Sequence, residues 1–204
     1  MSKEFNFEEN AQLAVRAKEA EWYETPEWAA NRILDVEIMT TNVIDPCAGR
    51  GVLGTAAYKK GYDKVLELDL NKWPGQPASV IPNINWLKNQ MMMDNILENW
   101  KEPTVFMNPP FSKATEFVEK GRALGFKHIF CFQRHAWMES QKREKFWNEN
   151  PPLHVYVMVN RQSCWRFDLA AYPELRVTPT GRPMSQTPTS HSWYTWDEGH
   201  PETT

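Results

Sequence analysis

The sequence predicts an α/β fold organised around a mainly parallel sheet, and three observations support this. A short buried strand at Val43-Ile44 runs into a glycine-rich turn and then into an apolar helix that extends to Lys60. A second strand, Tyr62 to Leu68, follows directly. Strands and helices then continue to alternate as far as Val159. Such alternation is typical of parallel sheets, because a chain that returns to start a parallel strand needs a crossover helix.

Length and composition indicate a single folded domain. The chain has 204 residues, a hydrophobic content of 41% and ten tryptophans, which argues against disorder across its body. We expect an N-terminal helical extension (1–21), a main domain (22–197) and a tail (198–204). No apolar run is long enough to span a membrane and the polar start is not a secretory signal, so we expect a cytoplasmic protein with no membrane partner. Three cysteines without metal-ligand spacing predict no metal site.

The N-terminal part predicts two helices. Glu8 to Glu21 has a weak apolar stripe and reads as a peripheral helix. Thr25 and Pro26 read as the N-cap and first turn of a second helix. The predicted buried side of that helix carries Ala29, Ala30, Ile33 and Leu34.

The glycine-rich turn between the first strand and its helix predicts a ligand site. It reads Asp45-Pro46-Cys47-Ala48-Gly49-Arg50-Gly51, and its two glycines remove side chains that would block the approach of a ligand. The next strand ends at Asp69, eighteen residues beyond Gly51, where an acidic group would meet ribose hydroxyls. The spacing predicts a nucleoside cofactor. Glu67 alternates on the same strand face and competes with Asp69, which we favour because it stands at the strand end.

The segment from Asn71 to Asn89 is rich in loop residues, with a short strand predicted at Ile84 to Leu87. The methionines Met91 to Met93 fit adaptable core packing, and Asp94 fits the cap of a short helix that follows it.

The second half of the chain completes the alternating pattern. We expect a strand at Thr104 to Met107, a helix at about Lys113 to Leu124, a strand at His128 to Phe132, a charged helix at Glu139 to Asn148 and a strand at Leu153 to Val159. A last strand, His191 to Trp196, is expected to form a terminal hairpin with Leu153 to Val159.

The run Asn108-Pro109-Pro110-Phe111 suits methyl transfer to a flat amino group. Such an amine is a poor nucleophile while its lone pair is delocalised into a ring. The side-chain oxygen of Asn108 and the carbonyl of Pro109 would each accept one N–H and free that lone pair for attack. Phe111 supplies a face on which the ring can stack, and the prolines stiffen the turn. These four residues are the predicted catalytic set.

In this order of motifs the chain resembles the class I S-adenosyl-L-methionine (AdoMet)-dependent methyltransferases, over roughly residues 22–197. Within them it is most similar to small phage or prophage enzymes that methylate the N6 amino group of adenine in DNA. The resemblance implies a single Rossmann-like domain with a mainly parallel seven-stranded sheet and an antiparallel last strand. It also implies AdoMet as cofactor and DNA as partner.

The resemblance assigns individual residues to the cofactor. Tyr23, Thr25 and Pro26 would lie near its methionine end, although capping remains an alternative role for Thr25 and Pro26. The methionine and ribose region would be held by Asp45, Pro46, Gly49 and Gly51, the ribose by Asp69 and the adenine amino group by Asp94.

A loop from Asn160 to Ser190 is the predicted substrate-reading segment, because a parallel strand ending at Val159 would deliver it to the edge of the sheet that holds the site. Its candidate substrate contacts are Arg161, Trp165 and Arg166. A plain surface loop is the alternative. The chain has a net charge of −3, but residues 120–182 carry eleven Lys and Arg against five Asp and Glu, which suits a polyanionic partner.

Other substrates and roles stay open at this point. Related Asn-Pro-Pro-aromatic loops act on RNA bases and on the side-chain amide of glutamine in proteins. Enzymes that act on the cytosine amino group more often resemble Ser-Pro-Pro-aromatic, so Asn108 favours adenine. A non-catalytic phage accessory that binds AdoMet or DNA is a different class of reading. With no large recognition domain, specificity would come from a loop, from a homodimer or from a partner; for a phage-encoded chain the compartment would be the host cytoplasm.

Overall fold

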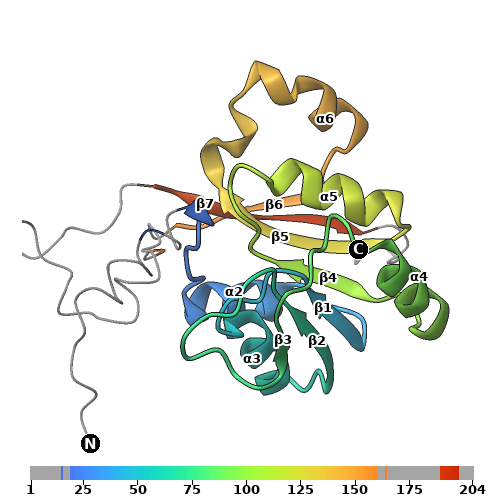
Figure 1. Ribbon diagram of the computed structural model, residues 1–204. Helices are drawn as coiled ribbons and strands as arrows, with labels where there is room; N and C mark the ends of the chain where they lie inside the picture. The colour runs from blue at the N-terminus through green and yellow to red at the C-terminus, as the bar shows by residue number, and fades with distance from the viewer. Residues whose placement is uncertain (1–14, 16–18, 160–163, 165–188, 198–204) are drawn as a thin grey trace, which may run out of the picture.

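The computed structural model describes residues 15, 19–159, 164 and 189–197. They form one seven-stranded sheet with the strand order β3-β2-β1-β4-β5-β7-β6 and with helices on both faces (Figure 1). The strands are β1 (Asn42–Asp45), β2 (Lys64–Leu68), β3 (Val80–Ile81), β4 (Thr104–Met107), β5 (His128–Arg134), β6 (His154–Val157) and β7 (His191–Asp197).

The sheet is parallel except for β7. The pairs β1 with β2, β1 with β4, β2 with β3 and β4 with β5 are parallel, whereas β7 runs antiparallel to both of its neighbours, β5 and β6. The predicted mainly parallel seven-stranded sheet with an antiparallel last strand is therefore confirmed. The last strand also pairs with β6, as expected, and it lies between β5 and β6.

The helices pack on the two faces of the sheet and divide the core in two. They are α2 (Glu27–Val36), α3 (Val52–Lys59), α4 (Gln90–Asn99), α5 (Ala114–Ala123) and α6 (Glu144–Glu149), with 3₁₀ turns at His135–Met138 and Gln141–Arg143. One core lies under α2 and α3 and contains Ala29, Ala30, Ile33 and Leu34, the residues predicted for the buried side of α2. The other lies under α4, α5 and α6.

Three sequence predictions need correction. The third strand is Val80–Ile81, and the segment from Ile84 to Leu87 forms a loop and turn instead. Asp94 lies inside α4, whose N-cap is Asn89: the Asn89 side chain accepts the N–H of Met92. The charged helix expected at Glu139 to Asn148 is broken, because Ser140 is extended with φ −152° and ψ 122° and only α6 is α-helical. The predicted extension (1–21), the loop 160–190 and the tail (198–204) lie largely outside the described residues.

The direction of the strands places one set of residues at one edge. β1, β2, β4 and β5 are parallel, so Asp45, Asp69, Asn108 and Arg134 all lie at or just beyond their carboxyl ends. Such an edge is where open α/β sheets bind ligands.

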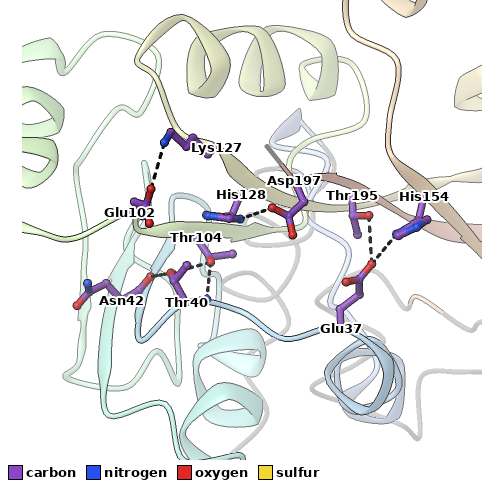
Figure 2. A network of polar contacts seen from close by, with 10 residues as sticks. All are labelled: Glu37, Thr40, Asn42, Glu102, Thr104, Lys127, His128, His154, Thr195 and Asp197. Atoms are coloured by element: carbon purple, nitrogen blue, oxygen red, sulfur yellow. Dashed lines mark hydrogen bonds and ion pairs between the residues drawn. The ribbon is translucent and has the colours of Figure 1, made fainter. Parts of the chain in front are cut away.

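The opposite edge is held by a polar network (Figure 2). His128 at the start of β5 pairs with Asp197 at the end of β7, with 2.7 Å between Nδ1 and Oδ1. Thr104 at the start of β4 accepts the N–H of Thr40 at 3.0 Å. Glu37, just after α2, accepts from His154 at 3.0 Å. These contacts join α2, β4, β5, β6 and β7 away from the ligand edge.

None of the helices in the described ranges is long and apolar enough to cross a bilayer.

Gly54 tests how tightly α3 packs against β2. A Cβ added to Gly54 would lie 2.2 Å from Oε1 of the buried Glu67. Helical Gly→Ala changes usually stabilise by about 1 kcal/mol, but here we expect Gly54→Ala to lower the free energy of unfolding by about 1–3 kcal/mol through overpacking. Urea unfolding followed by circular dichroism measures it.

The control is the same change in a Glu67→Ala background. Removing the carboxyl leaves room for the new methyl group, so Gly54→Ala should then stabilise the protein. Equal effects in the two backgrounds would contradict the close contact between Gly54 and Glu67.

Candidate active site

A cavity of about 640 Å³ lies at the carboxyl edge of the sheet. This volume is in the range of small-molecule binding sites, about 300–1,000 Å³. Eight of the residues that the sequence predicts for the site line it: Tyr23, Thr25, Asp45, Pro46, Gly49, Asp69, Asn108 and Pro110. The parallel strands thus bring together residues that lie up to 87 positions apart in the chain.

Other predicted site residues lie away from the cavity wall. Asp94 is exposed on α4 and accepts a hydrogen bond from Gln90 at 2.7 Å. Pro26 and Gly51 are the N-cap residues of α2 and α3. Pro109 and Phe111 belong to the Asn-Pro-Pro-Phe loop but not to the cavity lining. The predicted substrate contacts lie outside the described residues: Arg161, Trp165 and Arg166.

Sequence reasoning missed part of the wall. Trp22 and Trp73 line the cavity and stack on each other with ring centroids 4.0 Å apart. The loop after β3 contributes Asn85 and Trp86. Asp94 was predicted to contact the adenine amino group of the cofactor, whereas the polar residues that the loop after β3 supplies to the wall are Asn85 and Lys88. The segment from Asn71 to Asn89 has no periodicity from which these positions could be predicted.

The glycine-rich loop requires its first glycine at the cavity wall. Gly49 has φ +56°, in the left-handed region, and a Cβ added there would lie 2.8 Å from Nε1 of Trp22. Its N–H donates to Oδ2 of Asp69 at 2.8 Å, which ties the loop to the end of β2. Any larger residue at Gly49 would therefore strain the backbone and push Trp22 out of place.

The two cavity carboxyl groups differ in how they are satisfied. Asp45 is 1% exposed; its Oδ1 accepts the N–H of Cys47 at 3.1 Å, and its Oδ2 is buried without a hydrogen-bond partner among the described residues. Burial raises the pKa of Asp45 well above its usual range. Asp69 instead accepts three hydrogen bonds, two at Oδ1 from Asn71 and Trp73 and one at Oδ2 from Gly49. Burial also raises the pKa of Asp69.

These differences suit different ligands. A buried carboxylate oxygen without a partner, as in Asp45, is stabilised by a cationic donor. Oδ2 of Asp69 has one lone pair left, which fits a hydroxyl. Glu67, the competing candidate, does not line the cavity and packs against the backbone of Gly51 and Gly54 instead.

A short segment before α2, Glu21 to Thr25, crosses the site and is called the strap below. On one side it contacts the glycine-rich loop, where Trp22 packs on Gly49. Glu24 also forms a bidentate ion pair with Arg50 of this loop, with 2.7 Å between Arg50 Nε and Glu24 Oε1. On the other side it contacts the Asn-Pro-Pro-Phe loop, where Glu21 accepts the N–H of Ser112 at 2.8 Å. The strap therefore joins the two loops.

The strap also fixes the orientation of Asn108. The Asn108 Nδ2 donates to the carbonyl of Tyr23 at 3.0 Å and to the hydroxyl of Thr25 at 2.8 Å. A main-chain carbonyl can only accept, so the amide group facing Tyr23 must be the NH₂. Oδ1 of Asn108 then points away from the strap as an acceptor. No hydrogen bond to this oxygen is found among the described residues.

The neighbouring groups of the loop are also held from outside. The carbonyl of Pro109 accepts from Nε2 of the buried Gln133 at 3.4 Å, and one of its lone pairs remains. The Phe111 ring stacks on Tyr23, with centroids 5.1 Å apart, and the Arg134 guanidinium lies 3.9 Å from its centroid. The buried His191 ring stacks on Phe132, with centroids 5.1 Å apart, and its centroid lies 5.9 Å from that of Phe111. Burial, and then the charge of Arg134, lower the pKa of His191 to about 4.

Comparisons with known proteins agree on the fold. No family model and no curated protein sequence matches the chain. Solved structures do match over nearly its whole length. One is a protein from Pyrococcus horikoshii provisionally described as an RNA methyltransferase, with 17% identity, 98% of this chain and 100% of that chain covered, and a TM-score of 0.55.

Two further structures show the same fold. A SAM-dependent methyltransferase from Anabaena variabilis has 11% identity, coverage of 98% of both chains and a TM-score of 0.51. An O-methyltransferase from Bacillus cereus in complex with SAH has 9% identity, coverage of 97% of this chain and 93% of that one, and a TM-score of 0.50. At these identities the likeness shows the fold alone. The chain has a Rossmann-like fold of the kind found in class I methyltransferases.

The buried carboxyl of Asp45 predicts a pH effect on stability. Its pKa is raised in the folded state, so the stability tied to its protonated form is full below the usual carboxyl range and is lost as the pH rises through the raised value. The Asp45→Asn variant keeps the acceptor for Cys47 but cannot ionise. Relative to this variant, the wild type should lose unfolding free energy as the pH rises above the usual carboxyl range, about pH 4. Urea titrations at rising pH measure the difference.

A difference between the two proteins that does not change with pH would show that the Asp45 carboxyl does not titrate in a buried environment. Asp35, which is on the surface, serves as the control. Relative to an Asp35→Asn variant, the wild type should not lose unfolding free energy as the pH rises.

Proposed function

We propose that this protein is an AdoMet-dependent methyltransferase that acts on the exocyclic amino group of adenine in DNA. The observation that carries the proposal is the oriented amide of Asn108. Its nitrogen is held by Tyr23 and Thr25, so its oxygen is presented as an acceptor beside a cavity of cofactor size. The fold supports the proposal, because the similar structures include methyltransferases.

The cavity residues fit the cofactor. The Asp45 oxygen that lacks a partner would hold the ammonium group of the methionine part, and the free lone pair of Asp69 would hold a ribose hydroxyl. Gly49 leaves the loop backbone open to close approach. When bound, AdoMet supplies an electrophilic methyl group on a positively charged sulfur. The B. cereus protein was solved with SAH, the demethylated form of this cofactor.

The chain's own residues would activate the amine. Oδ1 of Asn108 and the carbonyl of Pro109 each accept one N–H of the substrate, which draws the amino group out of conjugation and frees its lone pair. Both acceptors are fixed in advance: Asn108 by the strap and Pro109 by Gln133. Preorganised acceptors of this kind lower the barrier because no reorganisation is needed at the moment of reaction.

Adenine in DNA is favoured over other substrates by the residues of the loop. Asn at position 108, rather than Ser, resembles adenine enzymes. In duplex DNA the target would have to be flipped out of the stack, at a cost of a few kcal/mol. RNA is the second candidate, because the P. horikoshii structure is provisionally described as an RNA methyltransferase. Homodimerisation and a cytoplasmic location stay predictions.

A non-catalytic binder is a weaker reading of the same site. A protein that only holds the cofactor or DNA has no need of two fixed amine acceptors. The hydrogen bonds to Tyr23 and Thr25 orient Asn108 at a position that cofactor binding alone does not require.

The decisive experiment is mass spectrometry of nucleosides from DNA and RNA of cells that express the wild type or Asn108→Ala. We expect N6-methyladenine in DNA from the wild type and none above background from the variant. In purified protein, Asn108→Ala should lower kcat by about 10²–10³-fold, as expected for loss of one preorganised group, while AdoMet binding by calorimetry is kept.

Asn95→Ala, on the exposed side of α4, is the matched control and should behave as the wild type. Methylated RNA or methylated polypeptide in place of DNA would replace the substrate in the proposal. If the protein binds AdoMet but transfers no methyl group to DNA, RNA or polypeptide, only the non-catalytic reading remains.

Thr25 tests whether the orientation of Asn108 matters. Thr25→Val removes the hydroxyl that accepts from Nδ2 but keeps the shape of the side chain. The loss of one hydrogen bond, about 1 kcal/mol, should lower kcat roughly fivefold to tenfold with little effect on the KM for AdoMet. Thr25→Ser keeps the hydroxyl and should restore kcat. Failure of Ser to restore it would mean that Thr25 acts through packing alone.

A further inference from the structure

Arg134 stands beside the Asn-Pro-Pro-Phe loop with a charge that the described structure leaves unmatched. It ends β5, next to β4, and the preceding residue, Gln133, holds the Pro109 carbonyl. Its guanidinium lies 3.9 Å from the centroid of Phe111 and 5.8 Å from that of Tyr23. Among the described residues no carboxylate lies within ion-pair distance of it.

The acidic groups closest along the loops are already engaged. Glu24 is paired with Arg50, Glu21 accepts the N–H of Ser112, and Asp69 accepts three donors. Within the aromatic cluster, the other titratable neighbours of Arg134 are His191 and Cys164. Neither carries a negative charge near neutral pH: an imidazole is neutral or positive there, and burial raises the pKa of the Cys164 thiol.

The contacts that Arg134 makes do not account for its position. Its Nε is buried without a hydrogen-bond partner, which is unfavourable. A cation over an aromatic ring gains some stabilisation, but the ring has no negative charge to match it. A ligand with anionic oxygens would pair with the charge of the guanidinium.

The ligand should belong to the substrate. Arg134 does not line the cavity that fits the cofactor, whereas it covers a face of Phe111 in the amine-acceptor loop. The residue is only half-buried, so a partner can reach it from outside. A planar guanidinium can hold a phosphate through two parallel hydrogen bonds.

We propose that Arg134 binds a phosphate of the strand that carries the target base, so that the site takes its amine from a nucleic acid and not from a protein glutamine. This rests on the proposed function and names the residue that would recognise the nucleic-acid backbone of its substrate. A glutamine side chain in a peptide brings no phosphate, and it would leave the cation beside Phe111 unmatched.

The test is direct binding, which does not depend on turnover. A fluorescein-labelled single-stranded oligodeoxynucleotide of about 12 nucleotides is titrated with protein, and anisotropy gives the binding constant at salt concentrations between about 50 and 200 mM. The slope of log K against log salt counts the phosphates that are neutralised. For Arg134→Gln we expect this slope to shrink by about 0.7, the value for one phosphate contact on a single strand.

Two variants make the result specific. Arg134→Lys keeps the charge and should keep the slope of the wild type. Arg32→Gln removes an exposed charge from α2, 72% exposed and paired with Asp35, and should leave the slope unchanged. If Arg134→Gln does not fold, as judged by its thermal melt, Arg134→Met repeats the neutralisation with a longer apolar stem.

The outcomes separate this inference from the proposed function. An equal slope for wild type and the neutral variants, or no binding of the wild type to the oligonucleotide, overturns the role of Arg134. A reduced slope supports it even if the wild type transfers no methyl group, in which case only the catalytic proposal fails. If the salt slopes of the wild type and the neutral variants are equal and methyl label enters polypeptide, the substrate is a protein and not a nucleic acid.

Discussion

The hydrogen bonds that hold the Asn108 amide nitrogen join the two halves of the site. One half is the glycine-rich loop with the cavity beside it, and the other is the Asn-Pro-Pro-Phe loop. The strap touches both, because Trp22 and Glu24 pack on the glycine-rich loop while Tyr23 and Thr25 accept from Asn108. Without these contacts the amide could turn over and present its NH₂, in place of its oxygen, on the side away from the strap. The orientation of the Asn108 amide therefore depends on the strap.

The direction of the parallel strands brings the other site residues to one edge of the sheet. Strands that run in the same direction end at the same edge, so Asp45, Asp69, Asn108 and Arg134 gather there without any special connection. The polar network of the opposite edge, with His128 and Asp197 at its centre, fixes the other ends of β5 and β7 (Figure 2). Binding and structural polar groups are thereby kept at opposite edges of the sheet.

The parts of the fold that the sequence predicts are those with local signals. The strand at Thr104 to Met107, the helix after the glycine-rich turn and the last strand each have a clear apolar pattern, and they are found close to the expected bounds. The two-residue β3 is too short for any period to appear, so the strand was placed at Ile84 to Leu87 instead. The broken helix after Glu139 depends on the extended backbone of Ser140, which its residue type does not reveal.

In the site, too, the parts with a local sequence signal could be predicted and the others could not. The two loops are visible as motifs, and eight of the predicted residues line the cavity. Contacts over a long sequence separation are not visible: Thr25 was expected at the cofactor or as a cap, and its bond to Asn108 spans 83 positions. Trp22 and Trp73 likewise meet only once the chain is folded. The lack of a carboxylate near Arg134 among the described residues likewise shows only in the folded structure.

The position of β7 has a consequence for how the chain reaches its native state. This strand follows all the others in the sequence, yet it lies inside the sheet, between β5 and β6. As the ribosome releases the chain from its N-terminal end, β6 emerges before β7, the strand with which it pairs among the described residues. Until β7 arrives, the outer flank of β5 is an unpaired edge made of buried, aromatic-rich sequence, the kind of surface that recruits strands from other molecules. Late insertion therefore makes this flank the point at which newly made chains are most exposed to misassembly.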